Sequence, residues 1–594
     1  MPSSTRALRL PAHLVLLALL LATLPLLLVT TADAAPPKPD TPKFGKAIEG
    51  YAPYEGGQFC DPVDTPGAKK LARLIRATYG SDESIGIARN ACYTTSEHND
   101  GRALDWMVDA TTRAGRAKAN AFLDWLLATD GRGNKDAMAR RLGVMYIIHN
   151  RQIWRAYDGG HWGTYSGTNP HTDHIHISLS YDGSTGRTSF WTGKPLGSSC
   201  ANGSLTTSAP KVETDPMRYV SVAPTRLAST ESGAGMLSGR CRLFHGSGRR
   251  VDVQVAGAGP VPGNGVAAVA LNVAMRRPNW RSALTAGPAG GDIPSVKRVS
   301  AEQNEVSTAS MVLPVGADGK VSFFSDFGAT DLAVSVVGYY VDPDAPLSVR
   351  RQIAADGGDQ FDGINPKRVA DLTLGRTESR KVAVAGVAGT DPASSSATVS
   401  VTVEAGAGHG SLYVYAAGQE RPKIPVVTYG KSATTVQTTV PIGRGGSIVV
   451  ENDGSKSRGV TVDLSGAYEP AALDGGRSLA VRKQPKKVVD TASGLGFSSL
   501  GDGASKTLAL GDSVPRGAQA VLLQVTAKNA KSAGSLTFWR PGTAKPGTID
   551  LSMRPGRAVT GTVIALVGDG RKVQVKNSGA QAPDLKITVL GSFH

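Results

Sequence analysis

The sequence has few aromatic residues, only four cysteines and a single long apolar run. Aromatic residues make up 6% of the 594 residues, so the core must consist largely of Val, Ala, Leu and Ile. A composition rich in Gly, Val, Thr and Ser favours strands and turns. With 40% apolar and 19% charged residues, a wholly disordered chain, a polytopic membrane protein and a collagen are excluded. At about 150 residues per domain, the length predicts roughly four domains.

No apolar stretch after the first 35 residues is long enough to span a membrane. At the start, two arginines precede a Leu-rich run from Leu14 to Val29, and an Ala-Asp-Ala site follows. This pattern predicts a signal peptide at 1–34 and a secreted protein without membrane association after cleavage. An uncleaved anchor is the weaker alternative, because the run is shorter than the ~20 residues of a spanning helix. The Pro- and Lys-rich segment 35–58 is expected to be a flexible lead-in.

The positive charge is not concentrated in one run. The formal net charge is +16, and its lysines and arginines are spread along the sequence, so nucleic-acid binding is not expected. An exported basic protein meets anionic surfaces such as a bacterial cell wall, but the charge could also serve solubility alone. The sequence leaves association with the cell wall open, and we expect a monomer.

The four cysteines are predicted to form two disulfides, because the protein is expected to be exported. Three pairings are possible. We favour Cys60–Cys92, because both residues flank the segment that leads into a histidine motif. Cys200–Cys241 is then the remaining pair, and it would join the first domain to the second.

Residues 59–200 differ from everything that follows. They hold five of the seven tryptophans. Helical spacing of apolar residues predicts helices, and apolar runs predict strands further along; the helices are expected at 69–79, 113–128 and 135–142, and the strands at 144–148, 152–157 and 175–179. We therefore predict an α+β domain at 59–200, followed by a linker at 201–217.

An internal repeat follows the linker. Leu284, Leu412 and Leu536 occupy matching positions 128 and 124 residues apart, and a glycine near the end of each unit recurs at similar spacing. Short apolar runs separated by Gly, Asp and Asn turns are typical of a sandwich or barrel. The sequence thus predicts three all-β repeats, at 218–343, 346–470 and 477–594.

Two short motifs in the first domain carry most of the candidate chemistry. The first runs from Ser96 to Asp105, and the second is His171-Thr-Asp-His-Ile-His176. Imidazole and carboxylate groups are the usual ligands of a catalytic zinc, which keeps one open position. His98, Asp105 and His176 are the expected ligands. His174 precedes His176 by two residues and is expected on the same side of a strand.

The first motif resembles the S-x-H-x-x-G-x-A-x-D signature of the VanY-type D-alanyl-D-alanine metallopeptidases. That family is grouped with lysostaphin, murein endopeptidases and the hedgehog signalling domain. All five signature positions match, namely Ser96, His98, Gly101, Ala103 and Asp105. The second motif resembles that of penicillin-insensitive murein endopeptidases. The resemblance implies that His176 is the third zinc ligand, and that His171 and His174 are catalytic or orienting residues.

The second motif departs from the VanY pattern at one position. VanY-type enzymes carry E-x-x-H with Glu as general base, whereas Asp173 stands at the matching position here. We favour His174 as the base, with Asp173 as the alternative. Arg89 resembles an upstream family arginine that could stabilise the oxyanion, although a purely structural role is equally open. Trp162 and Tyr165 are candidates to line the substrate groove, on a loop just before the second motif.

The resemblance implies a secreted zinc peptidase that hydrolyses amide bonds in the peptide part of peptidoglycan. The cofactor would be Zn²⁺, and the activity would be that of a D-Ala-D-Ala carboxypeptidase or a murein endopeptidase. The repeats contain no catalytic cluster and would be wall-binding or spacer modules. The alternative is a non-catalytic, zinc-containing protein that binds the cell wall or acts in adhesion, since fold alone does not settle function.

Overall fold

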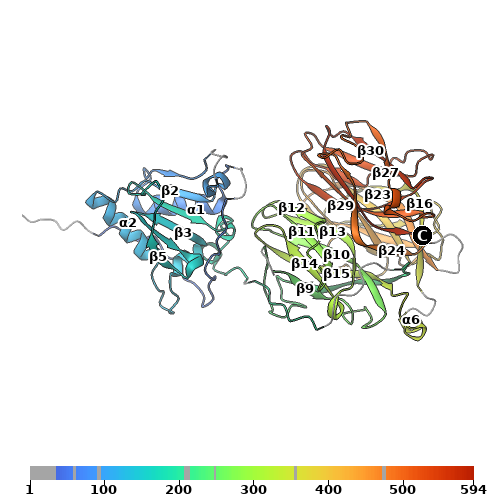
Figure 1. The fold of residues 1–594 in the computed structure, drawn as a ribbon, viewed down its shortest axis with the longest axis horizontal. Helices are drawn as coiled ribbons and strands as arrows, with labels where there is room; N and C mark the ends of the chain where they lie inside the picture. The colour runs from blue at the N-terminus through green and yellow to red at the C-terminus, as the bar shows by residue number, and fades with distance from the viewer. Residues whose placement is uncertain are drawn as a thin grey trace, which may run out of the picture.

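The computed structural model describes residues 35–57, 62–89, 95–197, 199–206, 215–245, 249–353, 358–470 and 477–594. An N-terminal body with most of the helices is followed by a larger body of strands (Figure 1). The protein is therefore multidomain and rich in β-structure, with several separate sheets. The expected signal peptide, Cys60 and Cys92 lie outside the described residues, so their predictions stay predictions. Within the described part, no helix is long and apolar enough to cross a membrane.

In its described residues, the N-terminal body contains a six-stranded antiparallel sheet and five α-helices. The strands follow the order β1 (Ile85–Gly86), β2 (Ala103–Trp106), β6 (Ile175–Leu179), β3 (Val144–His149), β4 (Gln152–Arg155) and β5 (His161–Thr164). The helices are α1 (Pro66–Tyr79), α2 (Arg113–Leu126), α3 (Ala137–Leu142), α4 (Tyr181–Ser184) and α5 (Ser189–Thr192), with 3₁₀ helices η1 (Glu97–Asp100) and η2 (Ala156–Asp158). Helix α1 begins three residues earlier than expected, because Pro66 is well placed in a first turn.

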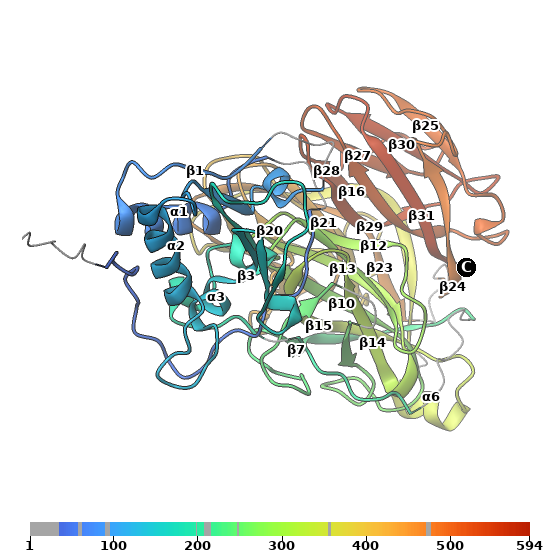
Figure 2. The same cartoon turned by 60° about the vertical axis from the view of Figure 1, so that its left-hand side comes forward.

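Large side chains join the helices to the sheet. The ring of Trp106 on β2 lies 4.9 Å from that of Tyr79 on α1 and 5.5 Å from that of Phe122 on α2. Helices α1, α2 and α3 lie together beside the sheet (Figure 2). Their apolar faces and the central strands form one continuous core.

The described part of the lead-in packs against this body instead of hanging free. Phe44 and Tyr51 contact its core, and the Tyr51 hydroxyl donates to Asp136 at 2.6 Å. Thr41 accepts a hydrogen bond from the indole of Trp125 at 2.7 Å. The physical reason is that apolar side chains of the segment, Phe44, Ile48 and Tyr51, pack against the core, although its prolines and lysines had indicated a flexible lead-in.

The strands of the larger body recur in three sets. The first set comprises β7 (Tyr219–Ser229), β8 (Leu243–Phe244), β9 (Val251–Gln254), β10 (Val266–Arg276), β11 (Ser282–Pro288), β12 (Lys297–Ala301), β13 (Val306–Pro314), β14 (Lys320–Ser325) and β15 (Ala329–Val341). The second comprises β16 (Asp359–Leu374), β17 (Ser379–Ala383), β18 (Ser396–Val403), β19 (Gly410–Ala416), β20 (Val427–Tyr429), β21 (Thr434–Pro441), β22 (Ser447–Gly454) and β23 (Arg458–Pro470). The third comprises β24 (Leu479–Asp490), β25 (Ser505–Ala509), β26 (Ala520–Lys528), β27 (Gly534–Trp539), β28 (Leu551–Met553), β29 (Val559–Leu566), β30 (Lys572–Ser578) and β31 (Asp584–Phe593).

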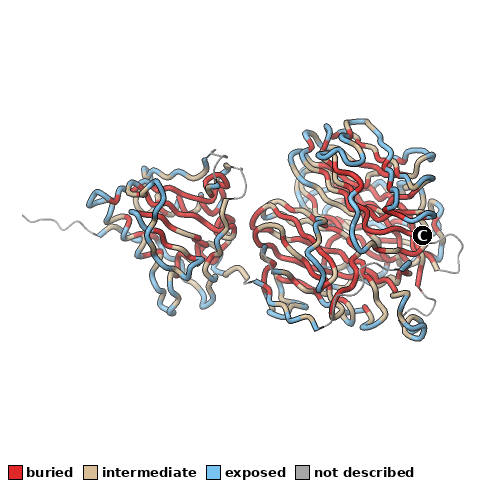
Figure 3. The backbone as a smooth tube through the Cα atoms, viewed as in Figure 1, coloured by how far each residue is buried: buried red, intermediate tan, exposed pale blue. Residues whose placement is uncertain are grey.

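Each set forms two antiparallel four-stranded sheets around its own apolar core. One sheet has the order β13-β10-β15-β7 in the first set, β16-β23-β18-β21 in the second and β24-β31-β26-β29 in the third. The other sheets have the orders β12-β11-β14-β9, β17-β22-β19-β20 and β25-β30-β27-β28. A pairing of Tyr219 with Asp359 joins the first two sets into a larger sheet that also takes in β8. Residues of these strands are mostly buried, and exposed residues are concentrated in the loops (Figure 3).

The three repeats pack in a closed ring. Equivalent strands β13, β21 and β29 contact one another at its centre, and the same heterologous contact recurs three times, as β20 with β13, β28 with β21 and β12 with β29. Equivalent residues Tyr340, Tyr468 and Phe593 share one core between the repeats. A heterologous contact that repeats and closes is the geometry of a cyclic trimer, here built within one chain.

The N-terminal body is fixed to the first repeat. The predicted Cys200–Cys241 disulfide is present. The buried guanidinium of Arg242 pairs with Asp182 and donates to the carbonyl of Ala329 at 3.0 Å. The described start of the expected linker also contacts the first repeat, because the amide N–H of Thr206 donates to Asp318 at 2.8 Å.

Candidate metal centre

Asp105 and His176 face each other on neighbouring strands. Strands β2 and β6 are antiparallel, and their register places Asp105 directly opposite His176. Strand β6 is itself internal to the sheet, between β2 and β3. Nδ1 of His176 lies 2.8 Å from Oδ1 of Asp105. Ordinary sheet pairing therefore brings together two residues that are far apart in the sequence.

His98 reaches this pair from the turn before β2. The Ser96 hydroxyl begins the turn by accepting a hydrogen bond from the His98 amide at 3.3 Å. Gly101 ends it in the left-handed region at φ 63°, where an added Cβ would lie 1.9 Å from the carbonyl oxygen of Val63. These two signature residues thus shape the turn that carries His98.

The three side chains form a compact set of metal ligands. Nε2 of His98 lies 3.3 Å from both Oδ1 of Asp105 and Nδ1 of His176. Two ligand atoms at ~2.0–2.1 Å from a tetrahedral zinc would lie about 3.3 Å apart. The exposed fractions are only 2% for His98, 3% for Asp105 and 7% for His176. The three residues could therefore hold a metal ion, and their donor types are among those that bind zinc in proteins.

The electrostatics of the site keep both histidines neutral, as metal binding requires. Burial, followed by the neighbouring His176, lowers the pKa of His98 to about 3. Burial also lowers the pKa of His176 to about 4, against the opposing effect of the Glu97 carboxylate. Each ring has its remaining nitrogen hydrogen bonded, His98 to the carbonyl of Ile87 and His176 to the hydroxyl of Ser178.

His174 faces the same centre and is oriented by Asp173. Its Nε2 lies 3.6 Å from Oδ1 of Asp105, and its Nδ1 lies 2.7 Å from Oδ1 of Asp173. The side chain of Asp173 is 65% exposed, whereas that of His174 is buried. Strand β6 begins one residue after His174. The ring of His171 lies 4.6 Å from that of His174, so the structure brings all three residues of the second motif together with the ligands.

The other candidates differ in their distance from the centre. The guanidinium of Arg89 bonds to Oδ2 of Asp105, while 56% of its side chain stays exposed. The ring of Tyr165 lies 5.1 Å from that of His171, at the rim of the site. Trp162 lies on the edge strand β5, opposite Trp154, and no contact in the described residues joins it to the ligands. Its place in a substrate groove stays a prediction.

Sequence reasoning missed three residues behind His176. The hydroxyl of Ser178 lies 2.9 Å from Nε2 of His176 and 3.4 Å from Oε2 of Glu97. The Tyr146 hydroxyl donates to the same Glu97 oxygen at 2.6 Å, and its ring stacks on His176 with centroids 5.5 Å apart. Two features of the sequence could have indicated these residues. Ser178 lies two residues after His176 on one strand and therefore on the same face, and Glu97 is a carboxylate inside the first motif.

Comparison with known proteins gives one family match. A model described as VldE, C-terminal domain, matches residues 61–176, a segment that ends at His176 and contains His98 and Asp105. None of the curated proteins matches the chain. Two solved structures, titled for a triple jelly roll fold in an archaeal virus and for Sulfolobus turreted icosahedral virus, are each 7% identical. Both matches cover 67% of this chain and 98% of the viral chain at a TM-score of 0.14, which supports no argument about this protein.

Proposed function

We propose that the N-terminal domain is a secreted zinc-dependent peptidase of the D-alanyl-D-alanine peptidase and murein endopeptidase group. It would hydrolyse amide bonds in the peptide part of peptidoglycan. The observation that carries this proposal is the convergence of four side chains, because His98, Asp105 and His176 form the ligand set and His174 faces it. A ligand set alone would serve a structural site, whereas an additional oriented imidazole fits a catalytic one.

The chain's own residues account for the proton transfers. A bound zinc ion would supply acidification of a water and polarisation of the scissile carbonyl. His174, held by Asp173 at Nδ1, accepts the water proton at Nε2 as the oxygen attacks the carbonyl carbon. The same proton passes to the leaving nitrogen when the C–N bond breaks. Arg89 is partly exposed beside Asp105 and can approach the developing oxyanion.

The repeats are proposed to bind cell-wall polymer or to act as spacers. Their closed ring has its own cores, and in the described residues the one His/Asp group with metal-ligand geometry lies in the N-terminal body. The peptidase would then be held at a fixed position on a rigid ring by Arg242 and the Cys200–Cys241 disulfide.

Mass spectrometry of muropeptides after incubation with the secreted chain tests the proposal. We expect a product that a chelator abolishes and zinc restores. His174→Ala should retain zinc but lose the product, whereas Asp105→Asn should lose both. A folded, zinc-loaded wild-type protein that yields no product would contradict the peptidase proposal and favour the binding protein without catalysis.

A further inference from the structure

Three equivalent loops meet at one end of the ring of repeats. Each loop follows an edge strand, β12, β20 or β28, of one of the two sheets in its repeat. Residues 302–305 lie between β12 and β13, residues 430–433 between β20 and β21, and residues 554–558 between β28 and β29. Although the loops are equivalent in position, their charges differ. The first carries two glutamates, the second one lysine and the third two arginines.

A cavity of about 740 Å³ opens beside these loops, between the first and second repeats, with the third repeat along one side. This volume is within the usual range for ligand sites. Five cationic side chains line it, and the only carboxylate in its lining is that of Glu305; the cations are Arg276, Lys423, Lys431, Arg554 and Arg557. Arg276 of the first repeat is itself paired with Glu231, so the excess positive charge of the groove comes from the second and third repeats, although no stretch of sequence is strongly basic.

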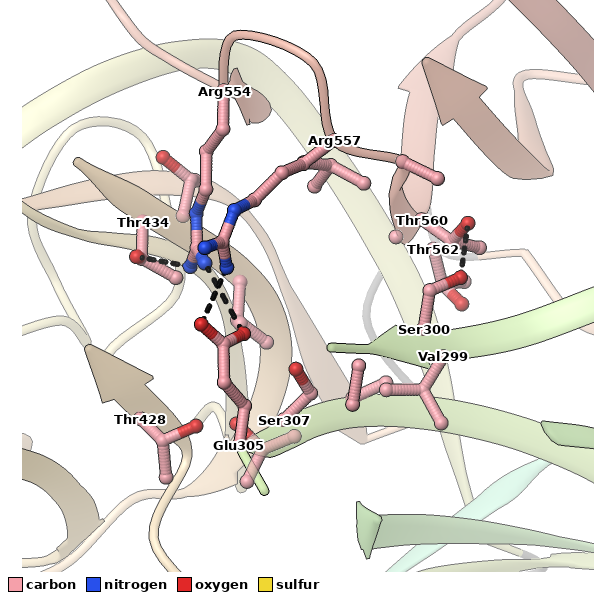
Figure 4. A pocket seen from close by; sticks show the side chains of 18 of the residues that line it. Val299, Ser300, Glu305, Ser307, Thr428, Thr434, Arg554, Arg557, Thr560 and Thr562 are labelled. Atoms are coloured by element: carbon pink, nitrogen blue, oxygen red, sulfur yellow. Dashed lines mark hydrogen bonds and ion pairs between the residues drawn. The ribbon is translucent and has the colours of Figure 1, made fainter. Parts of the chain in front are cut away.

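The negative charge in the groove is already engaged. Glu305 pairs with Arg557, and its second oxygen lies 4.0 Å from Arg554 (Figure 4). The guanidinium of Arg554 also donates to the hydroxyl of Thr434 at 2.8 Å. Burial lowers the pKa of Arg554. Of its charged neighbours, Glu305 raises this pKa and Arg557 lowers it. Glu302 also acts to raise that pKa, so two carboxylates of the first repeat offset the two guanidinium groups of the third.

Two lysines add charge without a partner. Lys423 and Lys431 are exposed, and their side chains form no ion pair or hydrogen bond within the described part of the chain. The groove also presents the hydroxyls of Ser411 and Ser432 and the half-buried ring of Tyr413. Cations beside hydroxyls and a ring fit a ligand that combines oxyanions with a polyhydroxylated backbone.

We propose that this groove binds the oxyanion groups of a polyhydroxylated anionic polymer, through phosphate or carboxylate. The groove would be the site at which the repeats bind cell-wall polymer, and in that respect the inference rests on the proposed function. The groove lies in the repeats, so a binding assay needs no peptidase activity. Failure here and failure of the peptidase proposal are therefore distinguishable.

Binding of the full chain to two defined polymers tests the inference. Poly(glycerol phosphate) provides phosphate, oligogalacturonate provides carboxylate, and dextran is the uncharged control. The variant Lys423→Glu/Lys431→Glu reverses the two free charges at exposed positions. The matched control, Lys381→Glu/Lys506→Glu, makes the same change of net charge on exposed strands β17 and β25.

We expect wild-type binding to at least one anionic polymer, weakening with added salt, and about a tenfold or greater loss in the groove variant. The control variant should stay within about twofold of wild type, because charges beyond a Debye length of ~8 Å are screened. The preferred polymer identifies phosphate or carboxylate as the ligand group. Equal losses in both variants, equal binding of dextran, or no binding to either anionic polymer would overturn the proposal.

Discussion

Replacing Glu97 with glutamine would test whether the residues behind His176 set its affinity for metal. Nδ1 of His176 faces the other two ligands, so Nε2 carries the ring proton and donates a hydrogen bond to Ser178. Ser178 in turn donates to Glu97, which also accepts from Tyr146. An anionic acceptor at the end of this relay favours the tautomer with a free Nδ1 and increases its basicity.

The expected loss follows from the geometry of the relay. Outer partners of metal ligands are worth about 10–100-fold in affinity. The Ser178–Glu97 separation of 3.4 Å is long for a hydrogen bond, so Glu97→Gln should lie near the lower end, at about tenfold or ~1.4 kcal/mol. Ser178→Ala removes the direct partner of Nε2 and leaves a buried N–H without its acceptor. Its expected loss is larger, at ~1–3 kcal/mol.

Competition with a chromogenic chelator would measure the zinc affinity of each variant, independently of any catalytic activity. Glu49→Gln is the matched control. The carboxylate of Glu49 lies in the same body and accepts a hydrogen bond from the amide of Ser189, and it has no described contact with the ligands. Both substitutions should change stability, but only Glu97→Gln should weaken zinc binding. Unchanged affinity in Glu97→Gln, or the same loss in Glu49→Gln, would refute the relay.

Three further predictions concern the stability of the repeats and of their junction with the N-terminal body. Burial raises the pKa of Asp550 to about 7. Its contribution to the free energy of unfolding is therefore complete below about pH 4 and falls by up to ~4 kcal/mol as the pH rises towards 7. Asp550→Asn should flatten the pH dependence of urea unfolding, whereas Asp569→Asn, at an exposed position, should not. Replacing Cys200 and Cys241 with serine should remove up to ~4 kcal/mol from the stability of the first repeat, since the disulfide closes a separation of 41 residues, and leave zinc affinity unchanged. Arg242→Ala should cost ~1–3 kcal/mol in chemical denaturation, because the half-buried carboxylate of Asp182 loses its charged partner and the carbonyl of Ala329 loses a donor.

Much of the site could be predicted because its residues are local in the sequence or alternate on strands. His98 and Asp105 lie in one motif, and His176 shares its strand with Ser178. The pairing of Asp105 with His176 depends on the register of β2 and β6, which spacing alone does not encode. The contact between Glu97 and Tyr146 likewise requires β3 to lie beside β6, an arrangement set by the whole sheet.

The repeat could be read from its period, but its assembly could not. Spacings near 125 residues predicted three similar β units, and the strand orders of the three units correspond. The ring depends on which edge of each unit contacts the next, and this is decided by side chains such as Tyr340, Tyr468 and Phe593. In the sequence they are only aromatic residues near the ends of apolar strands, indistinguishable from core residues of a separate unit.

Closure of the ring also explains how charge can gather without a basic segment. Arg276, Lys431 and Arg557 are more than a hundred residues apart in successive repeats, so the sequence shows them as scattered. Packing the repeats around one centre brings Lys431 and Arg557, which lie in equivalent loops, and Arg276, at the end of β10, into a single groove. Had the three loops kept the same charge, they would repel one another at this point. Glu305 of the first repeat offsets part of that repulsion by pairing with Arg557 of the third repeat. The different charges of the loops are therefore compatible with closure of the ring. The two lysines of the second repeat are left free for a ligand.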